Sequence, residues 1–431
     1  MLKITKASTV VLIFYVLFYV QIWGDNHLIL YGSAAVSVIS MLIYCMRTGS
    51  LAYDRVPYGI WNNLIMVIYT IVTGLFVSVD FQVSFRSSIT LFAFAAICIA
   101  LCYASAEEGS FEWMLKALIA LALLCSVYTI TCGTSWSGYG VSMSATNNPH
   151  TLGAVLNLGV FSIAYLVRDK KKKLSLINAT LIFLFTVVTI MCGSRKFLIA
   201  NVLIEGIWAW AVVREEWKTG DTNRKIIIAF LIIIIACVAY YIIHTVYLNS
   251  DSYNRMQNTN DMGNQHRIMF YEESWKIFLD HPIFGGGLNQ FSRRSTVATG
   301  NYAHSTYAEA IADFGFVGCV LYFTPIITVT YRIIKKALGS KRNYGDYLLL
   351  AFCLSELFIG TGQIFFLEFN HFIAWSIVFF YGQPDRNPML TGPVQQAAKR
   401  GKYLRYGQLA MDSMQRNTPA REMDRTGKYF R

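Results

Sequence analysis

The chain has 431 residues, of which 55% are hydrophobic and only 14% charged, and its mean hydropathy is +0.43. About a quarter of the residues in soluble globular domains are charged, so this composition excludes an ordinary soluble protein and favours a polytopic membrane protein. The net charge of +12 does not require a nucleic-acid partner, because membrane proteins concentrate Lys and Arg in their cytoplasmic loops.

Apolar runs recur along the chain at lengths close to the roughly 20 residues that a membrane-crossing helix needs. We therefore expect an all-α polytopic membrane protein with about twelve transmembrane helices. The predicted spans are 8–23, 28–46, 60–79, 88–105, 113–132, 151–167, 174–192, 197–213, 226–247, 306–331, 347–362 and 364–381.

The distribution of Lys and Arg predicts the orientation of these spans. If the N-terminus is cytoplasmic, only eight of the 37 Lys and Arg residues fall outside, which is the expected positive-inside bias. Both termini are then cytoplasmic. The predicted organisation is spans one to nine in 1–247, a long extracytoplasmic loop in 248–305, spans ten to twelve in 306–381 and a basic cytoplasmic tail in 382–431, with shorter outer segments at 80–87 and 133–150.

The few cations on the outer side form the first candidate site. One interpretation is that they contact lipid headgroups individually. As a set they favour an anion on the outer face, and the guanidinium of Arg matches phosphate oxygens best. The outer cations are Arg86, Arg195, Lys196, Arg255, Arg267, Lys276, Arg293 and Arg294.

The segment Gln265–Asp280 has the spacing of an amphipathic helix. His281–Pro282 is expected to end it, and Gly285–Gly287 allows a tight turn afterwards. The predicted apolar face carries Arg267, Phe270, Tyr271, Ser274 and Phe278, and the predicted polar face carries Glu272, Glu273, Lys276 and Asp280.

His304 lies just before predicted span ten and is a candidate general base, since imidazole titrates near neutral pH. A structural hydrogen-bonding role is the alternative. Glu309 and Asp313 follow on the same predicted helix, where they could orient His304, bind sugar hydroxyls or satisfy interior polar groups. Acidic residues inside other apolar spans are further functional candidates, with packing or ion pairing as an equal alternative; they are Glu205, Glu356 and Glu368.

No cofactor or metal is expected. The nine cysteines lie in or beside apolar spans without metal-ligand spacing, and no phosphate-binding loop, dinucleotide fingerprint or HExxH motif occurs. A reaction at this protein would therefore draw its energy from an activated substrate.

The order of motifs from about 145 to 320 resembles the O-antigen ligase/polymerase family. The family pattern R–x7–W, HP-x-x-G-x-G, His and G-x-x-G is matched at Arg267, Trp275, His281–Gly287, His304 and Gly315–Gly318. The segments SRKFL and ATNNPHTLGAVL resemble its upstream motifs. Ser305 stands where Asn usually follows the His, and Lys196 where Gly usually follows the Arg.

The resemblance implies a metal-independent glycosyltransferase of the helical membrane fold called GT-C, in the bacterial cytoplasmic membrane with its site facing outward. Arg195 and Arg267 would hold the diphosphate of a polyprenyl-linked oligosaccharide donor, and His304 would activate the hydroxyl of the glycan acceptor. Lys196, Arg293 and Arg294 are supporting candidates. Membrane lipids are expected partners, and a chain-length regulator or flippase is a candidate partner.

We place first the polymerisation of lipid-linked repeat units into O-antigen, capsule or exopolysaccharide, because no feature indicates a second, protein-binding domain. Three other functions remain open. A ligase would hand the finished glycan to lipid A-core or another acceptor. A lipid-linked oligosaccharide transporter would need charges along a central path and discontinuous spans. A structural partner in polysaccharide assembly would tolerate loss of His304 and Arg267.

Overall fold

The computed structural model divides the chain into a unit of Met1–Gln383 and a unit of Pro384–Arg431. All described residues belong to the first unit. The structure describes residues 27–48, 56–105, 110–136, 140–142, 149–167, 176–219, 222, 244, 262–297, 300–339 and 344–381.

The described part of the chain is almost entirely helical. The one sheet found there is a small hairpin, in which β1 (Thr134–Trp136) pairs antiparallel with β2 (Gly140–Ser142). The helices are α2 (His27–Thr48), α3 (Tyr58–Val77), α4 (Phe81–Ser105), α5 (Ser110–Cys132), α6 (Pro149–Leu166), α7 (Leu176–Met191), α8 (Arg195–Thr219), α11 (Met262–Asp280), α12 (Phe291–Arg294), α13 (Thr306–Leu338), α14 (Tyr344–Ile359) and α15 (Phe369–Tyr381).

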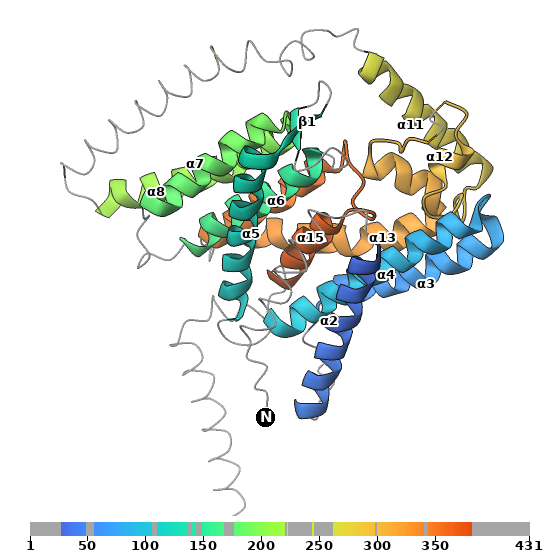
Figure 1. Ribbon diagram of the computed structural model, residues 1–431, viewed down its shortest axis with the longest axis horizontal. Helices are drawn as coiled ribbons and strands as arrows, with labels where there is room; N and C mark the ends of the chain where they lie inside the picture. The colour runs from blue at the N-terminus through green and yellow to red at the C-terminus, as the bar shows by residue number, and fades with distance from the viewer. Residues whose placement is uncertain are drawn as a thin grey trace, which may run out of the picture. The chain divides into compact units, whose positions relative to one another are not determined.

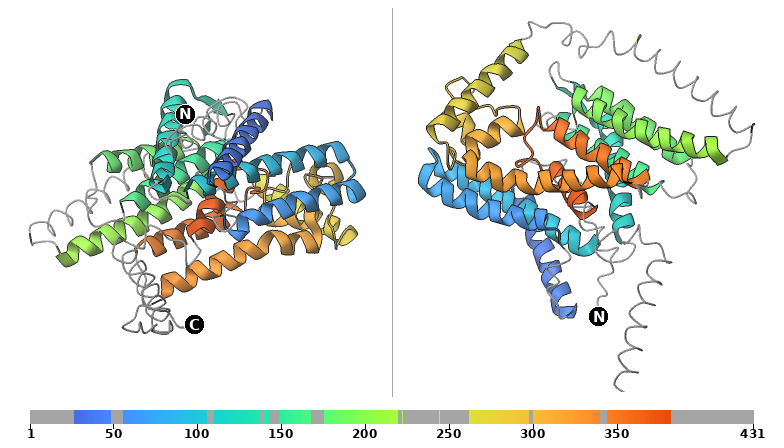
Figure 2. Two further views of the ribbon diagram at one scale, coloured as in Figure 1. Left: turned by 90° about the horizontal axis from the view of Figure 1, so that it is seen from below. Right: turned by 180° about the vertical axis from the view of Figure 1, so that it is seen from behind.

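Two groups of helices meet at the long helix α13. On one side α3 and α4 pack along each other, and α3 also contacts α13 (Figures 1 and 2). On the other side α8 packs against α6 and α14, and α14 in turn contacts α13. Helix α11 packs on α13 through Phe270 and Ile277, beside the short helix α12.

Apolar side chains face outward on these helices while polar ones are buried. On α3 the residues Ile65, Ile68, Val72 and Leu75 form one exposed stripe at helical spacing. Inside, Asn62 donates to the Leu321 carbonyl at 2.8 Å, a bond between α3 and α13. This is the pattern of helices that face lipid and join through polar contacts.

Four described helices are long and apolar enough to cross a membrane, namely Tyr58–Val77, Phe81–Cys102, Glu112–Cys132 and Thr306–Leu338. The shorter apolar helices are Leu28–Ile43, His150–Leu166, Ile177–Met191 and Phe369–Phe380. The all-helical membrane character predicted from the sequence is thus confirmed.

Predicted spans 8–23 and 226–247, and the tail 382–431, lie outside the described residues. Each of the other ten predicted spans overlaps a helix. The outer segment expected at 80–87 was wrong, because α4 begins at Phe81 and only three residues separate it from α3. Asp80 supports that start, since its carboxylate accepts from the Val83 amide at 3.1 Å.

Helix α13 is interrupted at Gly315, whose φ of 61° and ψ of −164° are not helical. The break leaves backbone groups without helical partners on both sides of Gly315. A segment after α11 satisfies them, as unpaired groups in a membrane protein require. The hydrogen bonds run from Gly286 to the carbonyl of Ala312 (2.8 Å), from Gly287 to Asp313 (2.9 Å), from Phe316 to Pro282 (2.8 Å) and from Val317 to Ile283 (3.0 Å).

Two glycines make this pairing possible. A Cβ on Gly285 would lie 2.4 Å from the Asp313 carbonyl oxygen, and one on Gly315 would lie 2.3 Å from the Gly285 nitrogen. Gly285 also has a φ of +74°, which side chains rarely adopt. Tyr69 of α3 completes the junction by donating its hydroxyl to the Phe314 carbonyl at 2.6 Å.

We expect Gly285→Ala to destabilise the protein by more than about 1 kcal/mol, because the new methyl group meets backbone and the residue keeps a positive φ. Thermal unfolding of the detergent-solubilised protein measures this. Gly206→Ala on α8 is the control, since a Cβ there has no neighbour within 4 Å and Ala favours a helix. Equal unfolding temperatures for the two variants would contradict the role given to Gly285.

Candidate anion-binding site around His304

His304 is held at the entrance to α13 in an unusual backbone conformation. Its φ of 53° lies in the left-handed region, which costs energy for a residue with a side chain. Ser305 caps α13 by accepting from the Ala308 amide at 3.4 Å. The Glu309 carboxylate accepts from the Ala303 amide at 2.6 Å and thereby fixes the residue before His304. Such a constrained backbone favours a functional side chain.

Aromatic rings flank the His304 imidazole. The Tyr302 ring centroid lies 4.1 Å away, and the Phe270 ring stacks at 5.9 Å with an interplanar angle of 12°. Phe270 comes from α11, so this contact sets α11 against the start of α13. His304 is half-buried.

Two cations surround this histidine. Arg267 of α11 and Lys196 of α8 are both electrostatic neighbours of His304, and Arg267 is also a neighbour of Lys196. Within the described part of the chain, no carboxylate pairs with Arg267 or Lys196. Burial, followed by the charge of Arg267, lowers the pKa of Lys196 to about 7, and an anion bound between the two side chains would stabilise the charged form of Lys196.

The same environment determines the protonation of His304. Burial, followed by the charges of Arg267 and Lys196, lowers its pKa from the usual 6.5 to about 4. The imidazole is therefore neutral at pH 7 and can accept a proton. A bound anion would offset the two cations and raise this pKa.

Sequence reasoning missed the loop between α14 and α15, which also reaches the cluster. The Lys196 ammonium donates to the Gly362 carbonyl. The Tyr271 hydroxyl of α11 donates to the Thr361 carbonyl at 3.2 Å, and the Thr306 amide of α13 donates to the Gly360 carbonyl at 2.9 Å. No local motif marks this loop, because its carbonyls act through backbone position alone.

A second histidine, from α6, contacts the residue just before α8. Arg195 is the first residue of the helix and half-buried. His150 of α6 contacts the hydroxyl of Ser194 through Nδ1 at 2.9 Å, just before Arg195. The segments that resemble the two upstream family motifs therefore meet in space, which their separation of some 40 residues in sequence did not predict.

Arg293 and Arg294 have partners elsewhere. Arg293 lies 3.9 Å from the Asp80 carboxylate. Arg294 donates to Gly286, to Val77 and to Nε2 of His281, the last at 2.6 Å. Burial, followed by the charge of Arg294, lowers the pKa of His281, which favours the neutral ring that can accept this bond.

Asp313 and Glu309 are buried and directed at backbone amides. Asp313 accepts from Asn289 at 2.6 Å, from Gln290 at 3.3 Å and from Phe291 at 3.0 Å, and so caps α12. Their roles as sugar ligands stay predictions, and the geometry favours positioning of the loops around His304.

Arg267 is exposed, although it lies on the same helix face as Phe270 three residues later. One expectation about α11 was wrong. Glu273, expected on the polar face, is 5% exposed and accepts from the Thr296 amide at 3.0 Å and its hydroxyl at 3.1 Å. Helical periodicity could not foresee this, because the partner comes from a loop more than twenty residues away.

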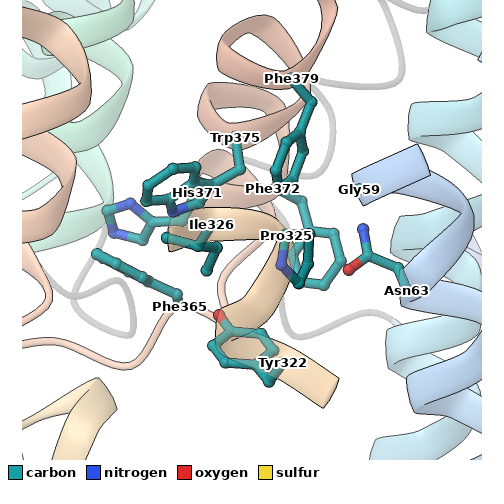
Figure 3. A pocket seen from close by; sticks show the side chains of 10 residues that line it. All are labelled: Gly59, Asn63, Tyr322, Pro325, Ile326, Phe365, His371, Phe372, Trp375 and Phe379. Atoms are coloured by element: carbon teal, nitrogen blue, oxygen red, sulfur yellow. The ribbon is translucent and has the colours of Figure 1, made fainter. Parts of the chain in front are cut away.

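A separate small pocket lies between α3, α13 and α15 (Figure 3). Aromatic rings dominate its lining, among them Tyr322, Phe365, Phe372 and Trp375. None of the residues predicted to form the site lines it. It is therefore distinct from the cluster around His304.

The described residues thus combine helices that are apolar enough to cross a membrane with two cationic side chains beside His304. Residues 179–323 match the family model described as O-antigen ligase, which confirms the resemblance to the O-antigen ligase/polymerase family. This family covers O-antigen ligases and related polymerases, which are glycosyltransferase-like enzymes. The match includes α8, α11 and the first half of α13, and thus Lys196, Arg267 and His304. No curated protein matches the chain.

The electrostatic origin of the His304 pKa can be tested directly. We expect Lys196→Met or Arg267→Met to raise it above 4, although below 6.5 because burial, the larger cause, remains. NMR titration of histidine-labelled protein, with the resonance assigned by its loss in His304→Asn, measures the shift. Lys276→Met is the control, since Lys276 on α11 pairs with Glu273 at 3.4 Å. A His304 pKa that does not move in the first two variants would contradict the cluster.

Proposed function

We propose that this protein is a glycosyltransferase that moves a glycan from polyprenyl diphosphate to an acceptor hydroxyl on the outer face of the bacterial cytoplasmic membrane. The observation that carries the proposal is the cluster of Lys196 and Arg267, without a carboxylate partner in the described residues, beside neutral His304. A diphosphate supplies the missing negative charge. Its leaving-group oxygen gains charge as the sugar departs, and fixed cations stabilise that charge.

The proposed reaction uses the two parts of the cluster together. The acceptor oxygen attacks the anomeric carbon and forms the new glycosidic bond, while the bond from that carbon to the diphosphate oxygen breaks and its electron pair leaves with the polyprenyl diphosphate. His304 takes the acceptor proton. Because the bound diphosphate offsets Lys196 and Arg267, it raises the basicity of His304 only when donor is present.

Polymerisation of lipid-linked repeat units is our first assignment. Transfer of a finished glycan to lipid A-core or a comparable acceptor is the second, and the family description favours it. Both reactions use the same donor chemistry and differ in the acceptor. The acceptor supplied in an assay therefore separates them.

We expect purified wild-type protein in lipid vesicles to lengthen a polyprenyl-diphosphate-linked repeat unit into a ladder of products. Loss of the proton acceptor in His304→Asn should lower the rate about 10²- to 10⁴-fold. Asn suits this variant because it tolerates a positive φ. Arg267→Met should lower the rate about 10²-fold or more, by analogy with the removal of one oxyanion donor. Gel analysis of the products measures both changes.

Lys276→Met serves as the control and should keep wild-type rates. Product that appears only after lipid A-core is added would assign the ligase. Movement of the donor across the bilayer without any glycan transfer would instead identify the protein as a transporter. Full activity in His304→Asn and Arg267→Met would remove both residues from the mechanism.

A further inference from the structure

The loop 360–365 connects the three elements that surround the cationic cluster. Its carbonyls accept from Lys196 on α8, from Tyr271 on α11 and from Thr306 on α13. The Phe365 amide also donates to the Thr306 hydroxyl at 2.9 Å. The loop is thus the common support of the elements that carry or flank Lys196, Arg267 and His304.

A buried pair joins the two helices at the ends of this loop. Nδ1 of His371 lies 2.7 Å from Oε2 of Glu356, and their side chains are only 1% and 3% exposed. Glu356 is in the last turn of α14 and His371 in the first turn of α15. The His371 ring also lies 4.5 Å from Phe365 in the loop and 6.2 Å from Phe197, the neighbour of Lys196.

We propose that Glu356 and His371 are positioning residues, which fix the loop 360–365 and thereby hold Lys196 in the cationic cluster around His304. The proposal rests on the proposed function insofar as that cluster binds the donor diphosphate. Neither residue touches substrate in this role. They act through the Gly362 carbonyl, which holds the Lys196 ammonium.

Positional precision is the physical reason for such a pair. Burying a carboxylate and an imidazole costs desolvation free energy, and their mutual attraction often does no more than offset this cost. A buried pair is therefore weak evidence for a gain in stability. It does fix a single geometry, because each partner is costly to leave alone. The Lys196 side chain is flexible and needs a fixed acceptor to keep its charge beside His304.

The test replaces both partners by apolar residues of similar size, in the double variant Glu356→Leu/His371→Phe. Removing both avoids a buried unpaired group, so folding should be retained. The matched control is Lys336→Met/Asp346→Leu. Lys336 and Asp346 lie 2.9 Å apart and join α13 to the first turn of α14, at the opposite end of that helix from Glu356.

With Lys196 released, we expect the pKa of His304 measured by NMR to move upward from about 4 in the Glu356→Leu/His371→Phe variant, as also expected for Lys196→Met. We also expect kcat/KM for transfer to fall about 10- to 100-fold, as for other misplaced groups. The control pair variant should match the wild type in both measurements. Glu356→Gln, which can still accept from His371, should keep the wild-type titration.

A folded double variant with wild-type titration and kinetics would overturn the proposal. Failure of this variant to fold, while the control pair variant folds, would assign the pair to stability and overturn it as well. If the wild type shows no transfer at all, the proposed function fails. The His304 titration still decides the positioning role in that case, since it requires no substrate.

Discussion

The structure depends on one interruption of backbone hydrogen bonding, at Gly315 in α13. Inside an apolar helix bundle, free carbonyl and amide groups cost several kcal/mol each, so a broken helix persists only where other backbone satisfies it. The segment 282–287 does so, at a contact too close for a Cβ on Gly285. This contact ties α11 to α13 and thereby brings Arg267 towards His304. The same backbone contact thus holds the helices together and positions the site around His304.

The constraint also explains why acidic residues near the site face backbone. Asp313 and Glu309 each hold a loop that the break of α13 requires, through amides at 289–291 and at Ala303. Both carboxyl groups accept from these amides, and neither forms an ion pair with Lys196 or Arg267 in the described part of the chain.

Much of the helical framework and the proximity of Lys196 and Arg267 to His304 could be predicted from sequence, for identifiable reasons, but the separate partners of Arg293 and Arg294 could not. Apolar length defines a span without tertiary information, and the glycines at 285 and 315 signal special backbone. The direction of side chains on α11 could not be predicted, because burial of Glu273 depends on Thr296 in a distant loop. The same holds for the support of Lys196, since a backbone carbonyl such as that of Gly362 leaves no trace in residue type.

The pairing of cations separates structural charges from functional ones. Arg293 faces Asp80, Arg294 is held by carbonyls and His281, and Lys336 pairs with Asp346. Each of these side chains has a carboxylate or a hydrogen-bond acceptor as a partner among the described residues. Lys196 and Arg267 instead lie beside a neutral histidine without a carboxylate partner among the residues that the structure describes, so a bound anion would reduce their mutual repulsion. The outer cations look alike in sequence, and their described partners distinguish Arg293 and Arg294, which contact other parts of the fold, from Lys196 and Arg267, which we propose bind the substrate.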